Sequence, residues 1–380
     1  MIYADNAATT KISERALAGM LPFLQEQYGN ASSRYSFGVK SKRAVEQARR
    51  QVAAAIGAKP AEIVFNSGGS EGDSWVIHGV AAEQCGNPIH IITSCIEHHA
   101  ILNACHSLEE NGVAAVTYLP VDSIGRVSVS DIESSIRPDT KLVSIMLANN
   151  EIGTIQPICE IGRFLHQRGI LFHTDAVQAV GHIPLSVGDL YVDFLTASAH
   201  KFNGAKGTGF VFCKSGISLP KLIFGGEQEQ GHRAGTENVA GIVAIGVALE
   251  ESIAIMDEES KKKNVLVKDT ITGLRAEIPG IIVNGENAER LPGILNITFS
   301  DVSGEAMMHL LDLKGICVST SSACTSAKDE PSHVLIALGL SEQQAKSSIR
   351  ISYGRYNLLQ DTVDIVKAIV DARRKIIYTK

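Results

Sequence analysis

The stretch LVSIMLANNEIGTIQPICEIGRFLHQRGILFH, residues 142–173, carries the pattern that decides the fold. It opens with the apolar run 142–146 and closes with the run 170–173, and both runs have the length and composition of buried strands. The amphipathic segment 158–167 between them predicts a helix, which Gly169 ends. A strand, a helix and a strand in this order predict two parallel strands of one sheet.

The same alternation extends outward from this stretch, over residues 42–215. Residues 62–65 and 89–92 are further apolar runs, and residues 100–110 form another amphipathic segment. This pattern predicts a mostly parallel sheet with helices on both faces. Ligands of such sheets gather at the carboxyl ends of the strands, so we expect the chemistry directly after each strand.

The pattern changes near residue 250, where a long polar helical stretch is predicted over residues 239–274. A smaller alternating unit follows, which predicts a second α/β domain. Its predicted strands are 294–299, 316–319 and 348–353, and its predicted helices are 305–313, 333–338 and about 360–377.

Composition argues against several classes of protein. The chain has 380 residues and a net charge of −6, which does not favour nucleic acid as a partner. No apolar run reaches about 18 residues, so no transmembrane helix is expected. The first residues lack the features of a signal peptide, and we therefore expect a cytoplasmic location. Residues 261–263, three lysines in a charged helical stretch, are interpreted as a solvated face.

Seven cysteines are scattered along the chain without a CxxC pair, which favours thiols over disulfides or a zinc site. Cys159 and Cys213 are expected to be small buried side chains, because their segments are apolar. Cys324 differs, because it lies in the small polar segment 319–326. An exposed, mobile thiol suits a nucleophile, although an incidental loop cysteine would look the same.

The sharpest chemical signal is Ser198-Ala199-His200-Lys201, followed by several glycines. A lysine at a strand end is typical of an amine that attacks an aldehyde, although a structural lysine is equally consistent with this segment alone. The glycines fit neither a P-loop nor a dinucleotide-binding fingerprint.

Polar residues follow three other predicted strands. Asp175, with Gln178 three residues on, can hold the protonated nitrogen of a pyridine ring or simply cap a helix. Gly69 and Ser70 stand at a predicted helix start, where a phosphate would fit and an ordinary turn would too. His98 can stack on a flat ring or move protons, and its neighbours predict no metal site.

The order and types of these motifs together resemble the cysteine desulfurases of the class V aminotransferase family, in the branch with a long mobile cysteine loop. The resemblance covers nearly the whole chain. It is carried by residues 3–10, 29–33, 94–98, 149–153, 175–178, 198–201, 233–238, 321–326 and 348–352.

The resemblance implies a fold-type I pyridoxal-phosphate enzyme of the α/β class. It implies a large domain of residues 15–255, whose mostly parallel mixed sheet is flanked by helices. It implies a smaller α/β domain of residues 1–14 and 256–380, with a mobile cysteine loop at about 319–330.

The resemblance also implies the role of each site residue and a cofactor, pyridoxal 5'-phosphate. Lys201 carries the cofactor and moves protons, and Cys324 takes sulfur from L-cysteine as a persulfide for an acceptor or scaffold protein. The other implied contacts are His98, Asp175, Gln178 and Asn150 to the ring, Gly69, Ser70, Ser198 and His200 to the phosphate with Thr236 from the second subunit of a homodimer, and Arg350, Asn150 and Asn30 to the substrate.

Other functions stay open at this point. A selenocysteine lyase shares these motifs, and only turnover of the two substrates separates it from a cysteine desulfurase. Another class V lyase or transaminase would not need Cys324. A scaffold without catalysis would not need Lys201, Asp175 and His98 together.

Overall fold

The computed structural model describes residues 1–84, 86–320 and 330–379. Its described part contains a seven-stranded sheet in the order β2-β8-β7-β6-β5-β3-β4, in which β8 alone is antiparallel to its neighbours. The strands are β2 (Ile63–Asn66), β3 (Ile89–Ser94), β4 (Ala114–Leu119), β5 (Thr140–Ser144), β6 (Leu171–Asp175), β7 (Phe194–Ser198) and β8 (Gly209–Cys213). This confirms the predicted mostly parallel mixed sheet.

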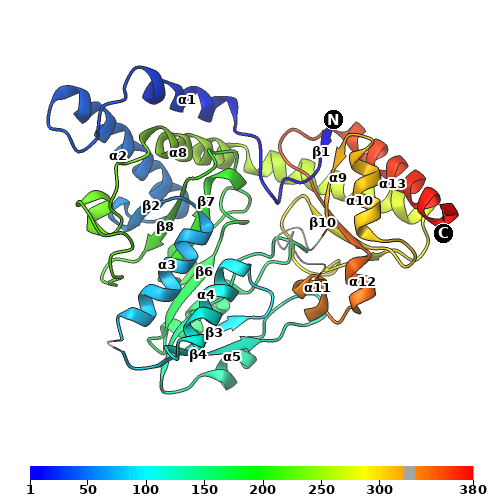
Figure 1. The fold of residues 1–380 in the computed structure, drawn as a ribbon, viewed down its shortest axis with the longest axis horizontal. Helices are drawn as coiled ribbons and strands as arrows, with labels where there is room; N and C mark the ends of the chain where they lie inside the picture. The colour runs from blue at the N-terminus through cyan, green and yellow to red at the C-terminus, as the bar shows by residue number, and fades with distance from the viewer. Residues whose placement is uncertain (85, 321–329, 380) are drawn as a thin grey trace.

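Helices cover both faces of this sheet because successive strand residues are apolar on both sides. Phe210 and Phe212 of β8 pack into one core and Val211 into the other. One face carries α1 (Glu14–Gln25), α2 (Ser36–Ile56), α6 (Ile158–His166) and α8 (Val239–Ala254), and the other α3 (Gly69–Ala82) and α4 (His99–Glu110) (Figure 1). The short helices α5 (Val129–Ser135) and α7 (Val187–Leu190) and the 3-10 turns η1 (Pro60–Glu62) and η3 (Gln228–Gly231) lie in connections.

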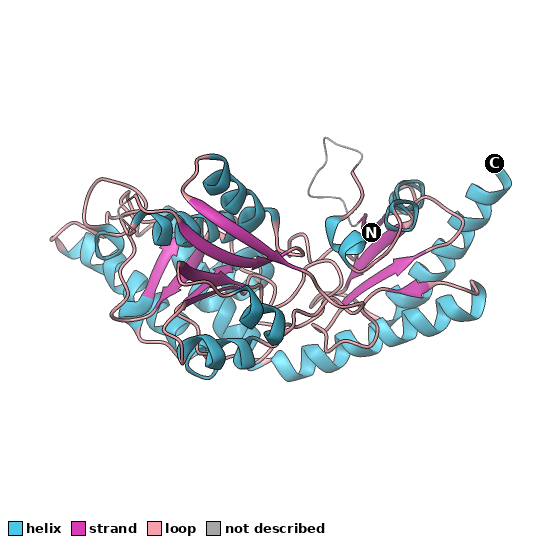
Figure 2. Ribbon diagram, turned by 90° about the horizontal axis from the view of Figure 1, so that it is seen from below, coloured by secondary structure: helices cyan, strands magenta, loops and turns pink. Residues whose placement is uncertain are grey.

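A second body holds an antiparallel sheet in the order β12-β13-β10-β9 and a parallel pair, β1 with β11. It has its own apolar core, and Figure 2 shows its strands set apart from those of the large sheet. Its elements are β1 (Ile2–Tyr3), α9 (Met256–Glu277), β9 (Ile282–Val283), β10 (Ile294–Thr298), α10 (Gly304–Asp312), β11 (Ile316–Cys317), β12 (Ser319–Thr320), α11 (His333–Ala337), α12 (Glu342–Lys346), β13 (Ser348–Ser352) and α13 (Leu359–Thr379).

The single helical stretch predicted over residues 239–274 is wrong. It forms two helices, α8 and α9, that meet at Ile255 with a bend of 71°. The apolar helix α8 lies in the core of the large body, whereas the polar helix α9 packs against α13, so a straight helix could not serve both. In the described part of the chain no single helix meets the length and hydropathy of a membrane span, and α8 with α9 meets them only as this bent pair.

Three smaller predictions also need correction. The strand expected over residues 316–319 divides into β11 and β12, because the two halves pair with different strands. Lys263 is buried against Glu259, so residues 261–263 are not a uniformly solvated face. Cys159 and Cys213 are half-buried, and among the described cysteines the buried one is Cys105. The proposed domain boundaries stay a prediction, although Ile255 lies at one of them.

Candidate active site

The turn after β7 forms the centre of the candidate site. β7 leads directly into the 3-10 turn η2 (Ala199–Lys201), whose last residue is the predicted cofactor-binding lysine. Lys201 Nζ donates to the backbone carbonyl oxygens of Ala7, at 2.6 Å, and Ala8, at 2.9 Å. The N-terminal segment therefore holds the amine at the carboxyl edge of the large sheet.

Asp175 ends β6 beside this turn and lines the same cavity as Lys201. Its Oδ1 accepts a hydrogen bond from the backbone N–H of Val177 at 2.9 Å. Burial raises the pKa of Asp175, while Val177 and the charge of Lys201 act in the opposite direction. Asp73 of α3 lines the same cavity, and burial and the charge of Asp175 raise the pKa of that carboxyl as well. Two buried carboxyls at one edge favour a positively charged ligand group there.

His98 stands at the N-cap of α4, where its Nδ1 accepts a hydrogen bond from the backbone N–H of Ala100 at 3.1 Å. Burial and the neighbouring charge of Lys201 lower the pKa of His98 to about 4. The imidazole is therefore neutral near pH 7, and because Nδ1 is an acceptor, its proton sits on Nε2. A neutral ring is suited to stacking on a flat ligand.

The amino end of α3 opens onto the same cavity. Gly69, Ser70, Ser198 and His200 all line it, and unpaired N–H groups at the start of a 14-residue helix favour an anion. Gly69 has no room for a larger side chain, because an added Cβ would lie 2.8 Å from Val177 Cγ2.

Arg350 projects from β13 of the second body and completes the cavity. One terminal nitrogen donates to the backbone oxygen of Asn150 at 3.0 Å, and the other pairs with Asp5 at 2.8 Å. Its Nε is buried and has no hydrogen-bond partner among the described residues. The guanidinium is therefore fixed by two contacts through its terminal nitrogens, and its planar fork has the geometry that pairs with a carboxylate.

The structure brings most of the predicted site residues around one cavity of about 500 Å³. Thr236 and Asn30 are exposed and do not line it, and Cys324 lies outside the described residues. The residues that line it as predicted are Gly69, Ser70, His98, Asn150, Asp175, Gln178, Ser198, His200, Lys201 and Arg350.

Sequence reasoning gave no role to several residues that the structure adds to the site. Asp5 pairs with Arg350, and the carbonyl of Ala7 also accepts a hydrogen bond from Gln178 Nε2 at 3.0 Å. Asp73 has a buried Oδ1 without a hydrogen-bond partner in the described chain. Asp5 and Ala7 lie in the quoted segment 3–10, which was the available signal for them.

A lysine, a buried carboxyl, a neutral histidine and a helix start around one cavity define the site of a pyridoxal-phosphate enzyme of fold type I. Residues 2–366 match the class V aminotransferase family, whose members depend on this cofactor. The chain belongs to that family.

Named relatives agree with this assignment. A cysteine desulfurase IscS of Clostridium botulinum (strain Hall) is 47% identical over 379 residues, 98% of this chain and 95% of the relative. A solved NifS-like protein superposes with a TM-score of 0.91 at 37% identity, covering 97% of this chain and 98% of that one. A structure described as SspA in complex with cysteine gives a TM-score of 0.81 at 34% identity, over 94% and 100% of the two chains.

Proposed function

We propose that this protein is a pyridoxal-phosphate-dependent cysteine desulfurase that moves the sulfur of L-cysteine onto Cys324. The observation that carries the proposal is that Lys201, Asp175 and Arg350 line one cavity. The names of the relatives, cysteine desulfurase and a complex with cysteine, support the same activity.

The residues of the cavity fit pyridoxal phosphate. Lys201 would carry the aldehyde carbon, Asp175 would hold the proton of the ring nitrogen, and His98 would lie on the ring. The start of α3 would bind the phosphate, since Gly69 leaves room for it. When bound, the cofactor supplies an electron-withdrawing ring that stabilises negative charge on the substrate carbon.

The protein's own groups then bind the substrate and move its protons. Arg350 binds the substrate carboxylate, which competes with Asp5 for the guanidinium. Lys201 Nζ, once it leaves the carbonyls of Ala7 and Ala8, takes and returns the proton of the substrate Cα.

The sulfur step needs a nucleophile. The Cys324 thiolate attacks the substrate sulfur, so that an S–S bond forms as the C–S bond breaks. A proton replaces sulfur on carbon, which gives alanine and an enzyme persulfide, and a sulfur-acceptor or scaffold protein removes the persulfide. We further propose a cytoplasmic homodimer in which Thr236 completes the partner's phosphate site and Asn30 assists Arg350.

Mass spectrometry after incubation with L-cysteine tests the reaction and its residue together. We expect a gain of one sulfur atom on Cys324, and a Cys324→Ala variant that binds substrate yet releases almost no sulfide. Lys201→Ala should lose the visible absorbance of bound cofactor. Normal sulfide release by the Cys324 variant would refute the persulfide step.

A selenocysteine lyase is the second candidate, because it would use the same cavity. The ratio of kcat/KM for selenocysteine and cysteine decides between them. A large preference for selenocysteine would replace the activity proposed above.

A further inference from the structure

The backbone of the turn that carries Lys201 is held by hydrogen bonds to side chains outside the cavity. His182 Nε2 lies 2.9 Å from the backbone oxygen of Lys201, and Ser252 Oγ donates to the next backbone oxygen, that of Phe202, at 3.2 Å. Neither side chain lines the cavity itself. Two successive carbonyls of the turn are therefore fixed by groups that the proposed reaction does not use.

The partners of His182 define its protonation. A backbone oxygen can only accept, so Nε2 carries a proton and donates it to Lys201 O. Lys263 Nζ lies 3.4 Å from the other ring nitrogen, Nδ1, and an ammonium can only donate. Nδ1 is therefore bare and the ring is neutral, in agreement with burial and the charge of Lys263, which lower the pKa of His182 to about 3.

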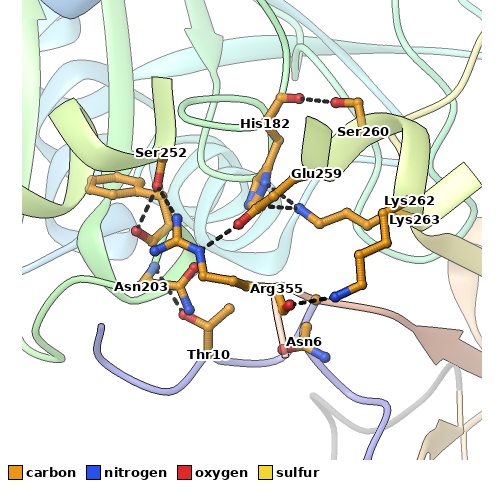
Figure 3. A network of polar contacts seen from close by, with 12 residues as sticks. Asn6, Thr10, His182, Asn203, Ser252, Glu259, Ser260, Lys262, Lys263 and Arg355 are labelled. Carbon is orange, nitrogen blue, oxygen red and sulfur yellow. Dashed lines mark hydrogen bonds and ion pairs between the residues drawn. The ribbon is translucent and has the colours of Figure 1, made fainter. Parts of the chain in front are cut away.

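Lys263 is itself fixed by an ion-pair network at the junction of the two bodies (Figure 3). It pairs with Glu259 at 2.9 Å, and the other oxygen of Glu259 pairs with Arg355. Arg355 also pairs with Glu251 at 3.0 Å and donates to Ser252 Oγ at 3.1 Å. Lys263 and Arg355 thus face the carboxylates of Glu259 and Glu251, and the network reaches the carbonyls of Lys201 and Phe202 through His182 and Ser252.

The backbone directly after Lys201 adopts a conformation that few residues favour. Asn203, two residues after Lys201, has φ of 64°, a left-handed conformation that costs a non-glycine residue free energy. Its backbone N–H and side chain are held by Thr10 Oγ1 and the oxygen of Lys11. His182 holds the backbone two residues earlier, at the oxygen of Lys201.

We propose that His182 is a positioning residue for Lys201, and that Lys263 orients its imidazole for this task. The imidazole fixes the backbone from which the amine projects, so it controls how well the amine is placed for the cofactor. The catalytic meaning of this inference rests on the proposed function. The hydrogen bond from His182 to the turn does not depend on that function, and its effect on the turn can be measured without cofactor.

Hydrogen exchange in the cofactor-free full chain measures how firmly His182 holds the turn closed. The amides of Phe202 and Gly204 both donate to the oxygen of Ala199, so a peptide covering residues 199–204 reports opening of the turn. His182→Leu should speed this exchange about tenfold, the factor that one lost hydrogen bond gives. His182→Gln keeps an N–H at similar reach and should restore most of the protection, and Lys263→Met should have a smaller effect in the same direction.

Cofactor titration measures the consequence. The dissociation constant for pyridoxal phosphate should rise about tenfold in His182→Leu and recover in His182→Gln. His90→Leu is the matched control, because it also removes a histidine with two hydrogen bonds, to Thr140 and Thr117, at the opposite end of the sheet. It should lower thermal stability without changing either readout.

The outcomes separate the two proposals. Unchanged exchange of peptide 199–204 in folded His182→Leu would overturn the positioning role, and so would an equal rise of the cofactor dissociation constant in the His90 control. Should His182→Leu not fold, Lys263→Met decides in its place, because it should still speed the exchange of peptide 199–204, and unchanged exchange in folded Lys263→Met would overturn the positioning role. If wild-type protein fails to bind the cofactor through Lys201, the proposed function falls, while exchange still decides whether His182 holds the turn.

Discussion

Replacing Glu229 with glutamine should destabilise this protein far more than the same change at its surface. Glu229 forms a two-point ion pair with Arg49, with both N–O distances at 2.8 Å, and the side chains are only 5% and 6% exposed. One carboxylate oxygen also accepts from the backbone N–H of Phe65 at 2.8 Å. Both oxygens therefore face donors only, and an amide would set its NH₂ against one of them.

The magnitude follows from burial. Arginine keeps its proton near neutral pH, so the guanidinium of Arg49 stays charged when Glu229 is replaced. Breaking a buried ion pair by removing one partner costs about 3–5 kcal/mol. The more exposed Glu46, whose Oε1 lies 3.3 Å from Arg49 Nε, stays in place and does not compensate for the two lost buried contacts. For a chain of 380 residues the entropy of unfolding is about 0.8 kcal/mol/K, so the thermal midpoint should fall by about 4–6 °C.

Thermal unfolding followed by circular dichroism checks this expectation. Glu286→Gln is the matched control, because Glu286 also pairs with an arginine, Arg275, at 2.6 Å, but their side chains are 39% and 48% exposed. Such a pair contributes about 0–1 kcal/mol, so its midpoint should move by about 1 °C or less. Equal shifts in the two variants would refute the argument that burial sets the cost.

Two further predictions concern Glu97, the sequence neighbour of His98, and Gly69 in the cavity. Burial raises the pKa of Glu97 to about 8, so its contribution to stability is complete below about pH 4.5 and lost as pH rises through 8. The free energy of unfolding of cofactor-free Glu97→Gln, measured relative to wild type, should therefore rise by on the order of 4 kcal/mol between pH 4.5 and 8.5. Urea denaturation of both proteins at the two pH values measures this difference, and the same difference at both would exclude the prediction. Gly69→Ala should raise the dissociation constant for pyridoxal phosphate about tenfold, because its Cβ would overlap Val177. Adding Val177→Ala removes the overlap and should return the constant to within about threefold, and failure of this rescue would refute overlap with Val177 as the cause.

The sequence predicts the large sheet well because the signal of a buried strand lies in the strand itself. The runs 142–146 and 170–173 correspond to β5 (Thr140–Ser144) and β6 (Leu171–Asp175), shifted by two residues or fewer. The bend at Ile255 is different, because its cause is the pair of cores on which α8 and α9 pack. No local pattern records which partner a helix will find.

The candidate site divides in the same way. The positions of Asp175 and Lys201 at this edge of the sheet are predictable, because ligands gather where strands end and few reactive side chains follow each predicted strand. The oxygens that hold Lys201 belong to Ala7 and Ala8, and a backbone carbonyl has no signature in sequence. The charge of Lys263 predicts an exposed side chain. Only the structure shows that Lys263 is buried and forms an ion pair with the buried Glu259.

If Arg350 binds the substrate as proposed, its pair with Asp5 explains how the guanidinium stays buried before the substrate arrives. An unpaired arginine at this depth would cost several kcal/mol, which Asp5 offsets before anything binds. In the proposed function an incoming carboxylate then exchanges one carboxylate partner of Arg350 for another. Asp5 lies two residues before Ala7, whose backbone oxygen accepts a hydrogen bond from Lys201 Nζ, as does that of Ala8. The proposed carboxylate site at Arg350 and the proposed catalytic amine therefore contact the same four-residue backbone segment, residues 5–8.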